Sequence, residues 1–174
     1  MSAAVIRVAG SLVEARPLPA ATVYEVAYVG EQRLRAEIIR VQGETATLQV
    51  FEDTTGLRVG EPVVTTGAPL CAQLGPGLLG MLLDGVGRPL DRVAAACGDC
   101  IAAGTAMPTL DAERVWTFTA TARVGDEVRP GDELGVVIEQ GDFRHRVLVP
   151  PRVSGRVANL RDGEYSITST VVAR

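Results

Sequence analysis

Short runs of β-branched and aromatic residues, each followed by a turn, most constrain what this chain can fold into. Three such runs occur at residues 22–29, 35–41 and 45–51, and Gly30 closes the first of them. The third run alternates polar and apolar side chains, which is typical of a strand with one buried face. Because strands at roughly ten-residue spacing leave exposed edges unless the sheet closes, we predict a small antiparallel β-barrel over residues 1–70.

The remainder of the chain contains one helix signal and then returns to strand patterns. Within residues 71–104, a helix is predicted over residues 88–96, where Pro89 suits a first turn and Gly98 a stop. Residues 105–174 contain two similar Gly-Asp-Glu turns and several β-branched runs. We therefore predict a mainly β protein with a barrel, a short linker with one helix, and a second β module.

The charged residues exclude several classes of function. All 17 basic residues are arginines, and with 21 acidic residues the net charge is −4. An acidic chain is a poor binder of nucleic acid or of anionic membranes. The absence of lysine excludes Schiff-base chemistry, biotinyl or lipoyl attachment, and a phosphate-binding loop of the G-x-x-x-x-G-K-[ST] type. Three cysteines imply no disulfide framework and favour a reducing, cytoplasmic setting.

One uncharged stretch, residues 62–83, has the length of a membrane span. It contains three prolines and four glycines, which would leave backbone groups unsatisfied in lipid. The N-terminus lacks a basic lead and is interrupted by Arg7, so no secretory signal is predicted. We therefore expect no insertion into a membrane.

Two short motifs resemble ligand sites only weakly. Residues 75–80, GPGLLG, match the G-x-G-x-x-G pattern that lets a backbone approach a pyrophosphate at a helix start. The internal proline and the lack of a βαβ pattern favour a packed turn instead. Cys97 and Cys100 form a C-x-x-C pair, but only Cys71 and His145 remain as further zinc ligands, and a thioredoxin-like context is missing. We favour two small buried residues over a metal or redox site.

A local basic stretch surrounds the only histidine, His145. It consists of Arg144, Arg146, Arg152, Arg156 and Arg161. Neighbouring positive charge makes this histidine a poor base, and no partner completes a catalytic triad. With only Phe143 nearby for stacking, nucleic-acid binding is not expected. We interpret the stretch as a solvated face, with a protein contact as the second interpretation.

Four acidic residues in the paired turns raise the question of calcium. These residues are Asp126, Glu127, Asp132 and Glu133. Their spacing lacks the alternating oxygen ligands of an EF-hand loop, so we interpret them as charged hairpin corners. We therefore expect no catalytic, cofactor-binding or metal-binding residue in this chain.

Six unusual strings occur in a fixed order along nearly the whole chain. They are VYEVAYVG (23–30), AEIIRVQG (36–43), LQVFEDTTGLRVGEPVVTTGAPL (48–70), LGPGLLGMLLDGVGRPLDRV (74–93), GDFRHRVLVPPRVSGRV (141–157) and GEYSI (163–167). This series resembles the N-terminal part of the catalytic A subunit of V-type and archaeal-type rotary ATPases. The elements FEDTTGL, GPGLL, DG-x-x-RPL and VPP-x-x-x-G are the most specific.

The resemblance implies a place for each part of the chain in a rotary assembly. Residues 1–70 would form the collar barrel, which contacts B subunits of the alternating ring. Residues 71–104 would lead toward a nucleotide-binding domain. Residues 105–174 would form the inserted bulge, a barrel-sandwich module that contacts peripheral-stalk subunits. The full-length protein would couple ATP turnover to proton transport, cytoplasmic and peripheral to the membrane.

The family's phosphate-binding loop, catalytic glutamate, ATP and Mg²⁺ all belong to the region beyond the bulge. We therefore expect this chain alone to be an assembly module that neither binds nor hydrolyses ATP. Four leucines that would pack on the nucleotide domain are expected to be exposed; they are Leu78, Leu79, Leu82 and Leu83.

Two alternative functions stay open. One is a stand-alone β-barrel binding module or divergent paralogue that meets an acidic partner through its arginines. The other is a small redox protein that uses Cys97 and Cys100.

Overall fold

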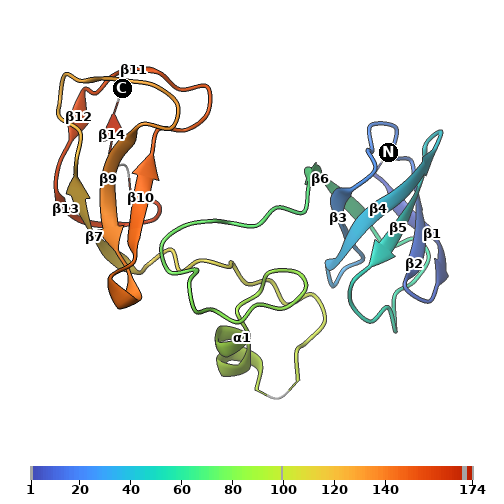
Figure 1. Cartoon of the computed structure of the whole chain (residues 1–174). Coiled ribbons are helices and arrows are strands. Elements are labelled where there is room, and N and C mark those ends of the chain that lie inside the picture. Colours follow the sequence, from blue (N-terminus) through green and yellow to red (C-terminus); the bar gives the residue numbers. More distant parts are fainter. Residues whose placement is uncertain (1, 99, 170–171, 174) are drawn as a thin grey trace. The chain divides into compact units, whose positions relative to one another are not determined.

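The chain folds into two compact units (Figure 1). The computed structural model describes residues 2–98, 100–169 and 172–173. The first unit consists of Met1–Ala72 and Leu83–Met107, and the second of Gln73–Leu82 and Pro108–Arg174. Antiparallel strands make up most of the regular structure of both units, which confirms the predicted mainly β fold class.

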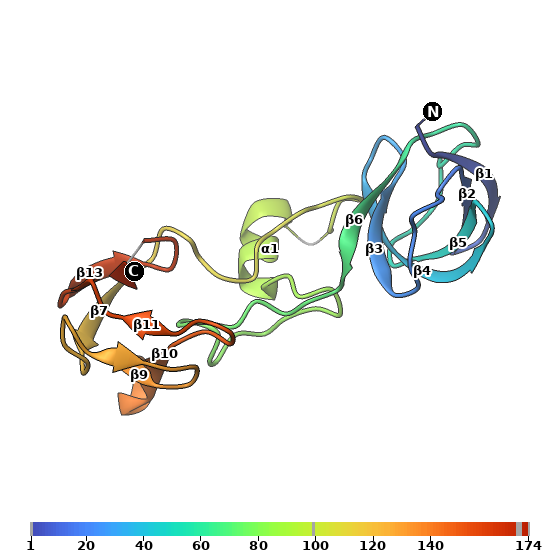
Figure 2. The same ribbon diagram turned by 90° about the horizontal axis from the view of Figure 1, so that it is seen from above.

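Six strands form the barrel of the first unit. They are β1 (Ala4–Ala9), β2 (Leu12–Arg16), β3 (Glu25–Val29), β4 (Leu34–Gln42), β5 (Thr45–Val50) and β6 (Val63–Pro69). Their order is β1-β2-β5-β4-β3-β6. The sheet closes on itself because the Val63 N–H donates to the Ala3 carbonyl and the Val5 N–H to the Glu61 carbonyl, each at 2.9 Å. Figure 2 shows these strands wrapped into a ring, an arrangement that pairs the sheet edges.

Alternate side chains of the strands fill the barrel. In β4, Leu34, Ala36 and Ile38 are buried, whereas Arg35 and Glu37 between them are only half-buried. This period of two is the one expected of a strand with one face in a core. The full core consists of Ala3, Val5, Val13, Ala15, Leu18, Ala27, Val29, Leu34, Ala36, Ile38, Ala46, Leu48, Val50 and Val63.

The three predicted runs correspond to β3, β4 and β5. The first was expected from residue 22 but begins at Glu25, because Tyr24 adopts a left-handed backbone with φ of 72° and so interrupts the extended chain. Strands β1, β2 and β6 were not predicted individually.

The predicted helix is present as α1 (Leu90–Cys97). Pro89 precedes the helix with extended backbone angles instead of occupying its first turn. Gly98, with φ of 69°, ends the helix, and its N–H donates to the Ala94 carbonyl at 2.9 Å. Val93 supplies the buried side chain of this short helix.

The second unit contains, within its described residues, eight short strands and one 3-10 turn. They are β7 (Val115–Ala120), β8 (Glu127–Val128), β9 (Glu133–Ile138), η1 (Gln140–Asp142), β10 (Arg144–Leu148), β11 (Gly155–Arg156), β12 (Asn159–Leu160), β13 (Gly163–Ser166) and β14 (Val172–Ala173). One sheet has the order β10-β9-β7-β13, and two smaller pairs join β11 to β8 and β12 to β14. Its core consists of Trp116, Phe118, Leu134, Val137, Val149, Val157 and Leu160.

The two Gly-Asp-Glu turns of the second unit are held in the same way. In the first, the Gly125 N–H donates to the Val157 carbonyl at 2.8 Å. In the second, the Gly131 N–H donates to the Val149 carbonyl at 3.0 Å. Both glycines have positive φ, of 97° and 88°, which other residues adopt only with strain. The similar turns in the sequence are therefore similar in structure.

Within the described ranges, no helix is long and apolar enough to cross a membrane.

Candidate functional site

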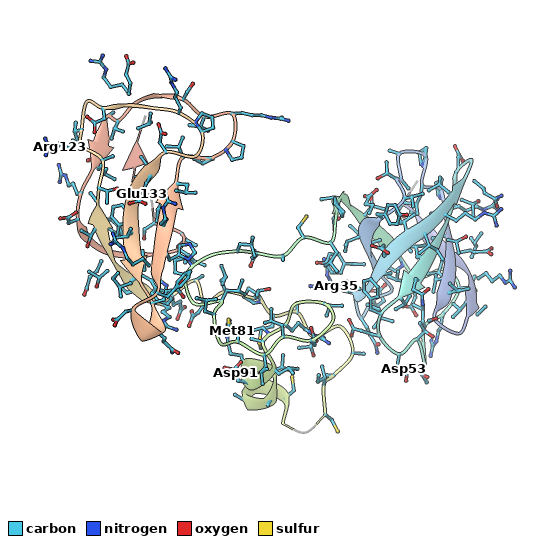
Figure 3. All side chains as sticks on the ribbon, in the orientation of Figure 1. Arg35, Asp53, Met81, Asp91, Arg123 and Glu133 are labelled. Atoms are coloured by element: carbon cyan, nitrogen blue, oxygen red, sulfur yellow. The ribbon has the colours of Figure 1, made fainter. Side chains whose placement is uncertain are left out.

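Two polar contacts hold residues 83–107 against the barrel of the first unit. Arg35, labelled in Figure 3, donates from Nη1 to the Val86 carbonyl at 2.8 Å. Glu52 accepts a hydrogen bond from the Gly104 N–H at 2.6 Å. Gly104 has φ of 73°, and a Cβ at this position would clash with the Gln32 carbonyl oxygen. The segment that follows the barrel is therefore fastened to it at a position that requires glycine.

The DG-x-x-RPL motif forms a partly buried ion pair. The Arg88 side chain donates from Nε to Asp84 Oδ2 at 2.6 Å and from Nη1 to the Thr105 carbonyl at 3.1 Å. The N–H groups of Arg88 and Val86 donate to the other oxygen, Asp84 Oδ1. Burial raises the pKa of Asp84, but these hydrogen bonds and the Arg88 charge outweigh burial and leave the pKa lowered. The motif fixes the turn that precedes α1.

Glu25 is a buried carboxylate at the point where β6 leaves the barrel. It is only 4% exposed. One oxygen accepts the Gly67 N–H at 2.7 Å, and the other accepts the Thr22 N–H at 3.0 Å. Burial raises the pKa of Glu25, but hydrogen bonds from Thr22, Gly67 and Thr65 lower it. Together these hydrogen bonds outweigh burial, and the net shift of the pKa is downward. Sequence reasoning missed this residue.

The GPGLLG segment is a turn held by a buried carboxylate of the second unit. Glu139, which is 8% exposed, accepts the Gly77 N–H at 2.7 Å. Gly77 has φ of 94°, and a Cβ there would meet the Trp116 ring at 2.9 Å. Since a protein carboxylate already occupies the N–H that a phosphate would need, the motif is a packed turn, as predicted.

His145 does not lie on a solvated face, so that part of the sequence interpretation is wrong. Its Nδ1 lies 2.9 Å from Glu139 Oε1, and its side chain is 29% exposed. The alternation of β10 turns His145 inward while Arg144 and Arg146 remain exposed. Glu139 therefore joins the turn at Gly77 to His145, an arrangement that sequence reasoning also missed.

The arginines of the basic stretch are solvent-exposed, and two of them are paired. Arg146 donates to Glu133, and Arg156 lies 3.6 Å from Glu127. The hydrogen bond from Arg146 lowers the pKa of Glu133. The turn carboxylates offset part of the local positive charge.

The two aspartates of the paired turns cap those turns. Asp126 accepts the Arg123 N–H at 2.8 Å, and Asp132 accepts the Arg129 N–H at 2.7 Å. These contacts agree with the interpretation of charged hairpin corners. In the part of the chain that the structure describes, no three His, Cys, Asp or Glu side chains form a group that could hold a metal ion.

All three cysteines are free thiols. Cys97 is half-buried, with its Sγ 4.0 Å from Thr105 Oγ1, whereas Cys71 and Cys100 are exposed. The expectation that Cys97 and Cys100 are both buried is therefore wrong: Cys97 is only half-buried, and Cys100 is exposed because it lies past the end of α1.

Most of the leucines expected at an uncovered surface are exposed. Leu79, Leu82 and Leu83 have 52%, 75% and 38% of their surface accessible. Leu78 is an exception because it is half-buried. Leu74, which the sequence did not single out, is 79% exposed.

Two domain models of one family match the chain. Residues 5–67 match the β-barrel domain of the ATP synthase alpha/beta family, and residues 107–174 match the ATP synthase alpha/beta subunit barrel-sandwich domain. The first match covers nearly all of the barrel strands, from within β1 to within β6, and the second covers the strands of the second unit.

Proteins with similar sequences carry consistent names. The chain is 44% identical to V-type ATP synthase alpha chain 1 of Clostridium tetani, over 96% of this chain and 28% of that protein. It is 47% identical to the V-type ATP synthase alpha chain of Anaeromyxobacter dehalogenans strain 2CP-1, over 99% of this chain and 30% of that protein. It is 48% identical to the A subunit of the A-type ATP synthase of Thermococcus onnurineus, over 96% of this chain and 29% of that protein. The chain thus spans less than a third of the length of these curated relatives.

A solved structure gives a weaker match. It is the assembled ATPase EscN with its central stalk EscO from the type III secretion system of enteropathogenic E. coli, at 30% identity and a TM-score of 0.47 over 50% of this chain and 21% of that chain.

The sequence matches do not favour a stand-alone binding module, because nearly the whole chain aligns with alpha chains or A subunits of ATP synthases. Along the chain, the β-barrel model matches residues 5–67 and the barrel-sandwich model matches residues 107–174. The chain belongs to the ATP synthase alpha/beta family.

Proposed function

We propose that this chain is the N-terminal portion of the catalytic A subunit of a V/A-type proton-translocating ATP synthase. The observation that carries the proposal is the alignment of 96–99% of the chain with alpha chains and A subunits of such synthases. In the full-length protein, ATP turnover would be coupled to proton transport, with ATP and Mg²⁺ bound outside these 174 residues. The full-length protein would be cytoplasmic and peripheral to the membrane.

The part played by the present residues is assembly. Residues 1–70 would contact neighbouring B subunits, residues 71–104 would lead toward the nucleotide-binding domain, and residues 105–174 would contact peripheral-stalk subunits. The hydrogen bonds that close the barrel at Val5 and Val63 already use part of the β1 and β6 edges, which supports a contact made by side chains instead of strand pairing. Tyr24 and Val59, 67% and 66% exposed, are apolar side chains that a neighbour could cover.

Catalysis is not expected of these residues alone. The sequence has no lysine, so it contains no phosphate-binding loop of the kind that cradles the β- and γ-phosphates. The purified chain should show no ATP hydrolysis above a protein-free blank, in a coupled assay with Mg²⁺. Turnover that copurifies with the chain would contradict this part of the proposal.

The first test of the whole proposal is the mass of the native gene product in its own cells. A product several times heavier than 18.3 kDa would support it. A product of 18.3 kDa that fails to associate with the B subunit would overturn it.

A second test addresses the barrel contact. We expect Tyr24→Ser combined with Val59→Ser to weaken association of the chain with the purified B subunit by about tenfold, since exposed aromatic anchors dominate many interfaces. The matched control is Val124→Ser, which changes a valine of the second unit that is 59% exposed. Equal loss in the control would refute a contact through the barrel.

A further inference from the structure

The second unit contains an apolar cavity of about 510 Å³ that is partly open to solvent. Its walls include Trp116, Phe118, Leu134, Val137, Val149 and Val157. Cavities that bind small organic ligands have volumes of roughly 300–1,000 Å³ and a mostly apolar lining. The size and the apolar lining therefore fit a ligand site better than a packing defect.

One polar group at the wall lacks a partner. Trp116 is 8% exposed, and its indole Nε1–H finds no hydrogen-bond acceptor among the residues that the structure describes. A buried donor without an acceptor is destabilising, and an acceptor atom on a bound molecule would remove that cost. On one side of the ring, the Arg114 guanidinium lies 4.1 Å from the centroid, which fixes the orientation of the indole.

A cation also lines the cavity. The Arg156 side chain is 71% exposed, and it forms a long ion pair of 3.6 Å with Glu127, whose side chain is itself 82% exposed. A guanidinium offers five N–H donors in a planar fork that matches a carboxylate. The cavity is mostly apolar, with one buried donor, one solvent-accessible arginine, and Ser154, Ser166 and Ser169 also in its lining. Such a lining is complementary to an amphipathic anion.

We propose that this cavity binds a small amphipathic carboxylate, with its hydrocarbon part against Phe118 and Val137, which are cross-strand neighbours in β7 and β9. The carboxylate would meet Arg156, and an acceptor oxygen or water carried with the ligand would satisfy Trp116. Gly75 and Pro76 also line the cavity. The ligand therefore touches the turn that Glu139 holds, and its binding would rigidify residues 75–80.

The chain contains a built-in reporter for this proposal, because Trp116 is its single tryptophan. We would titrate the 174-residue chain with sodium decanoate, below its micellar range, and follow tryptophan emission. The matched ligands are 1-decanol, which lacks the charge, and decyltrimethylammonium, which reverses it. We expect a saturable change with decanoate, binding of decanol weaker by roughly two- to fivefold, and still weaker binding of the cation.

Amino-acid substitutions can distinguish binding in the cavity from binding at the surface. Val137→Phe should fill the chamber and reduce decanoate affinity at least tenfold, while the far-UV circular dichroism stays unchanged. Val147→Phe fills the same space from a half-buried position and replaces the first variant should that one fail to fold. Arg156→Gln should weaken decanoate roughly two- to fivefold and leave decanol unchanged. Arg123→Gln, an exposed arginine of the same unit outside the cavity, is the control.

Three results would overturn the proposal. One is a linear response to decanoate without saturation, which would mean surface adsorption or a chamber filled by the protein itself. Another is unchanged affinity in a folded cavity-filling variant. The third is equal affinity for the anionic and cationic decyl compounds, which would remove the role of Arg156.

Discussion

Glu139 illustrates how a single buried carboxylate can organise residues that are distant in sequence. It joins the Gly77 N–H to His145, and the first of these contacts spans 62 positions of the chain. Removing an acceptor in such a position leaves buried donors without partners, which costs more than the hydrogen bonds themselves contribute.

We therefore predict that Glu139→Ala lowers the free energy of unfolding of the second unit by about 2 kcal/mol. Glu139→Gln should lose less, because its amide oxygen can still accept one N–H. Urea unfolding followed through Trp116 emission would measure both variants, and the Gly77 amide should exchange faster with solvent in the alanine variant. Glu164→Ala, at an exposed carboxylate of the same unit, should stay within about 0.5 kcal/mol of the parent. A Glu139→Ala chain as stable as the parent would show that the contact is dispensable.

Glu25 should make the stability of the barrel depend on pH. Its pKa in the folded state lies below the ordinary value of 4.5, so the folded protein favours the charged form more than the unfolded chain does. The resulting stabilisation is present in full above about pH 4.5 and is lost as the pH falls through the folded-state pKa.

The measurement is amide hydrogen exchange of the barrel core at Ala36 and Ile38, at pH 7, 5 and 3. We expect the parent chain to be more protected than Glu25→Gln at pH 7, and the difference to shrink toward pH 3. The control is Glu31→Gln, which alters an exposed glutamate. If the difference in protection between the parent chain and Glu25→Gln were the same at all three pH values, the expected pH dependence of stability would be contradicted.

Sequence patterns could not single out Glu25 or Glu139. Each carboxylate accepts one of its hydrogen bonds from a residue far along the chain, and period-two patterns report only which face of a strand is apolar. The error at His145 has a local cause. Local charge suggested an exposed site, whereas its partner Glu139 lies across the turn between β9 and β10.

At the scale of elements, Gly104 decides whether residues 83–107 stay on the barrel. Alanine there would face both a positive φ and the Gln32 carbonyl oxygen, while the N–H that Glu52 accepts would be displaced. We predict that Gly104→Ala speeds amide exchange throughout α1 by at least tenfold and leaves the β4 core unchanged. Gly85→Ala, in the same segment with open space around it, should behave like the parent. Equal protection of α1 in both variants would mean that other contacts hold the segment.

The elements that sequence reasoning found are those with strong local signals. Strands β3, β4 and β5 have β-branched runs or alternation, and α1 is framed by Pro89 and Gly98. Strand β6 was missed because it lies at the start of the uncharged stretch at residues 62–83. There the apolar residues follow neither the period of two of a strand nor the period of 3.6 of a helix. Closure of the barrel was inferred from the general cost of open edges, but the hydrogen bonds from Val5 and Val63 that achieve it depend on distant partners.

At the scale of the whole molecule, the exposed leucines predict self-association. Leu74, Leu79 and Leu82 lie within nine residues of one another, and each is more than half exposed. Clusters of apolar surface of this kind favour contact with a second molecule. We expect the weight-average mass of the chain to rise with concentration in sedimentation equilibrium, and the triple change of these leucines to Gln to abolish the rise. A strictly monomeric parent chain would contradict the prediction.

The division into units has a practical consequence for anyone who dissects this protein. The polypeptide leaves the first unit after Ala72, returns to it after Leu82 and leaves again after Met107. No single cleavage of the polypeptide therefore yields both units whole. Wherever the chain is cut, a segment of one unit remains attached to the fragment that holds the other unit. A fragment that starts at Pro108 would lack Gly77, the donor that Glu139 needs. Separate expression of the second unit requires residues 73–82 to be grafted onto it, because truncation alone would leave one oxygen of the buried Glu139 side chain without its Gly77 donor.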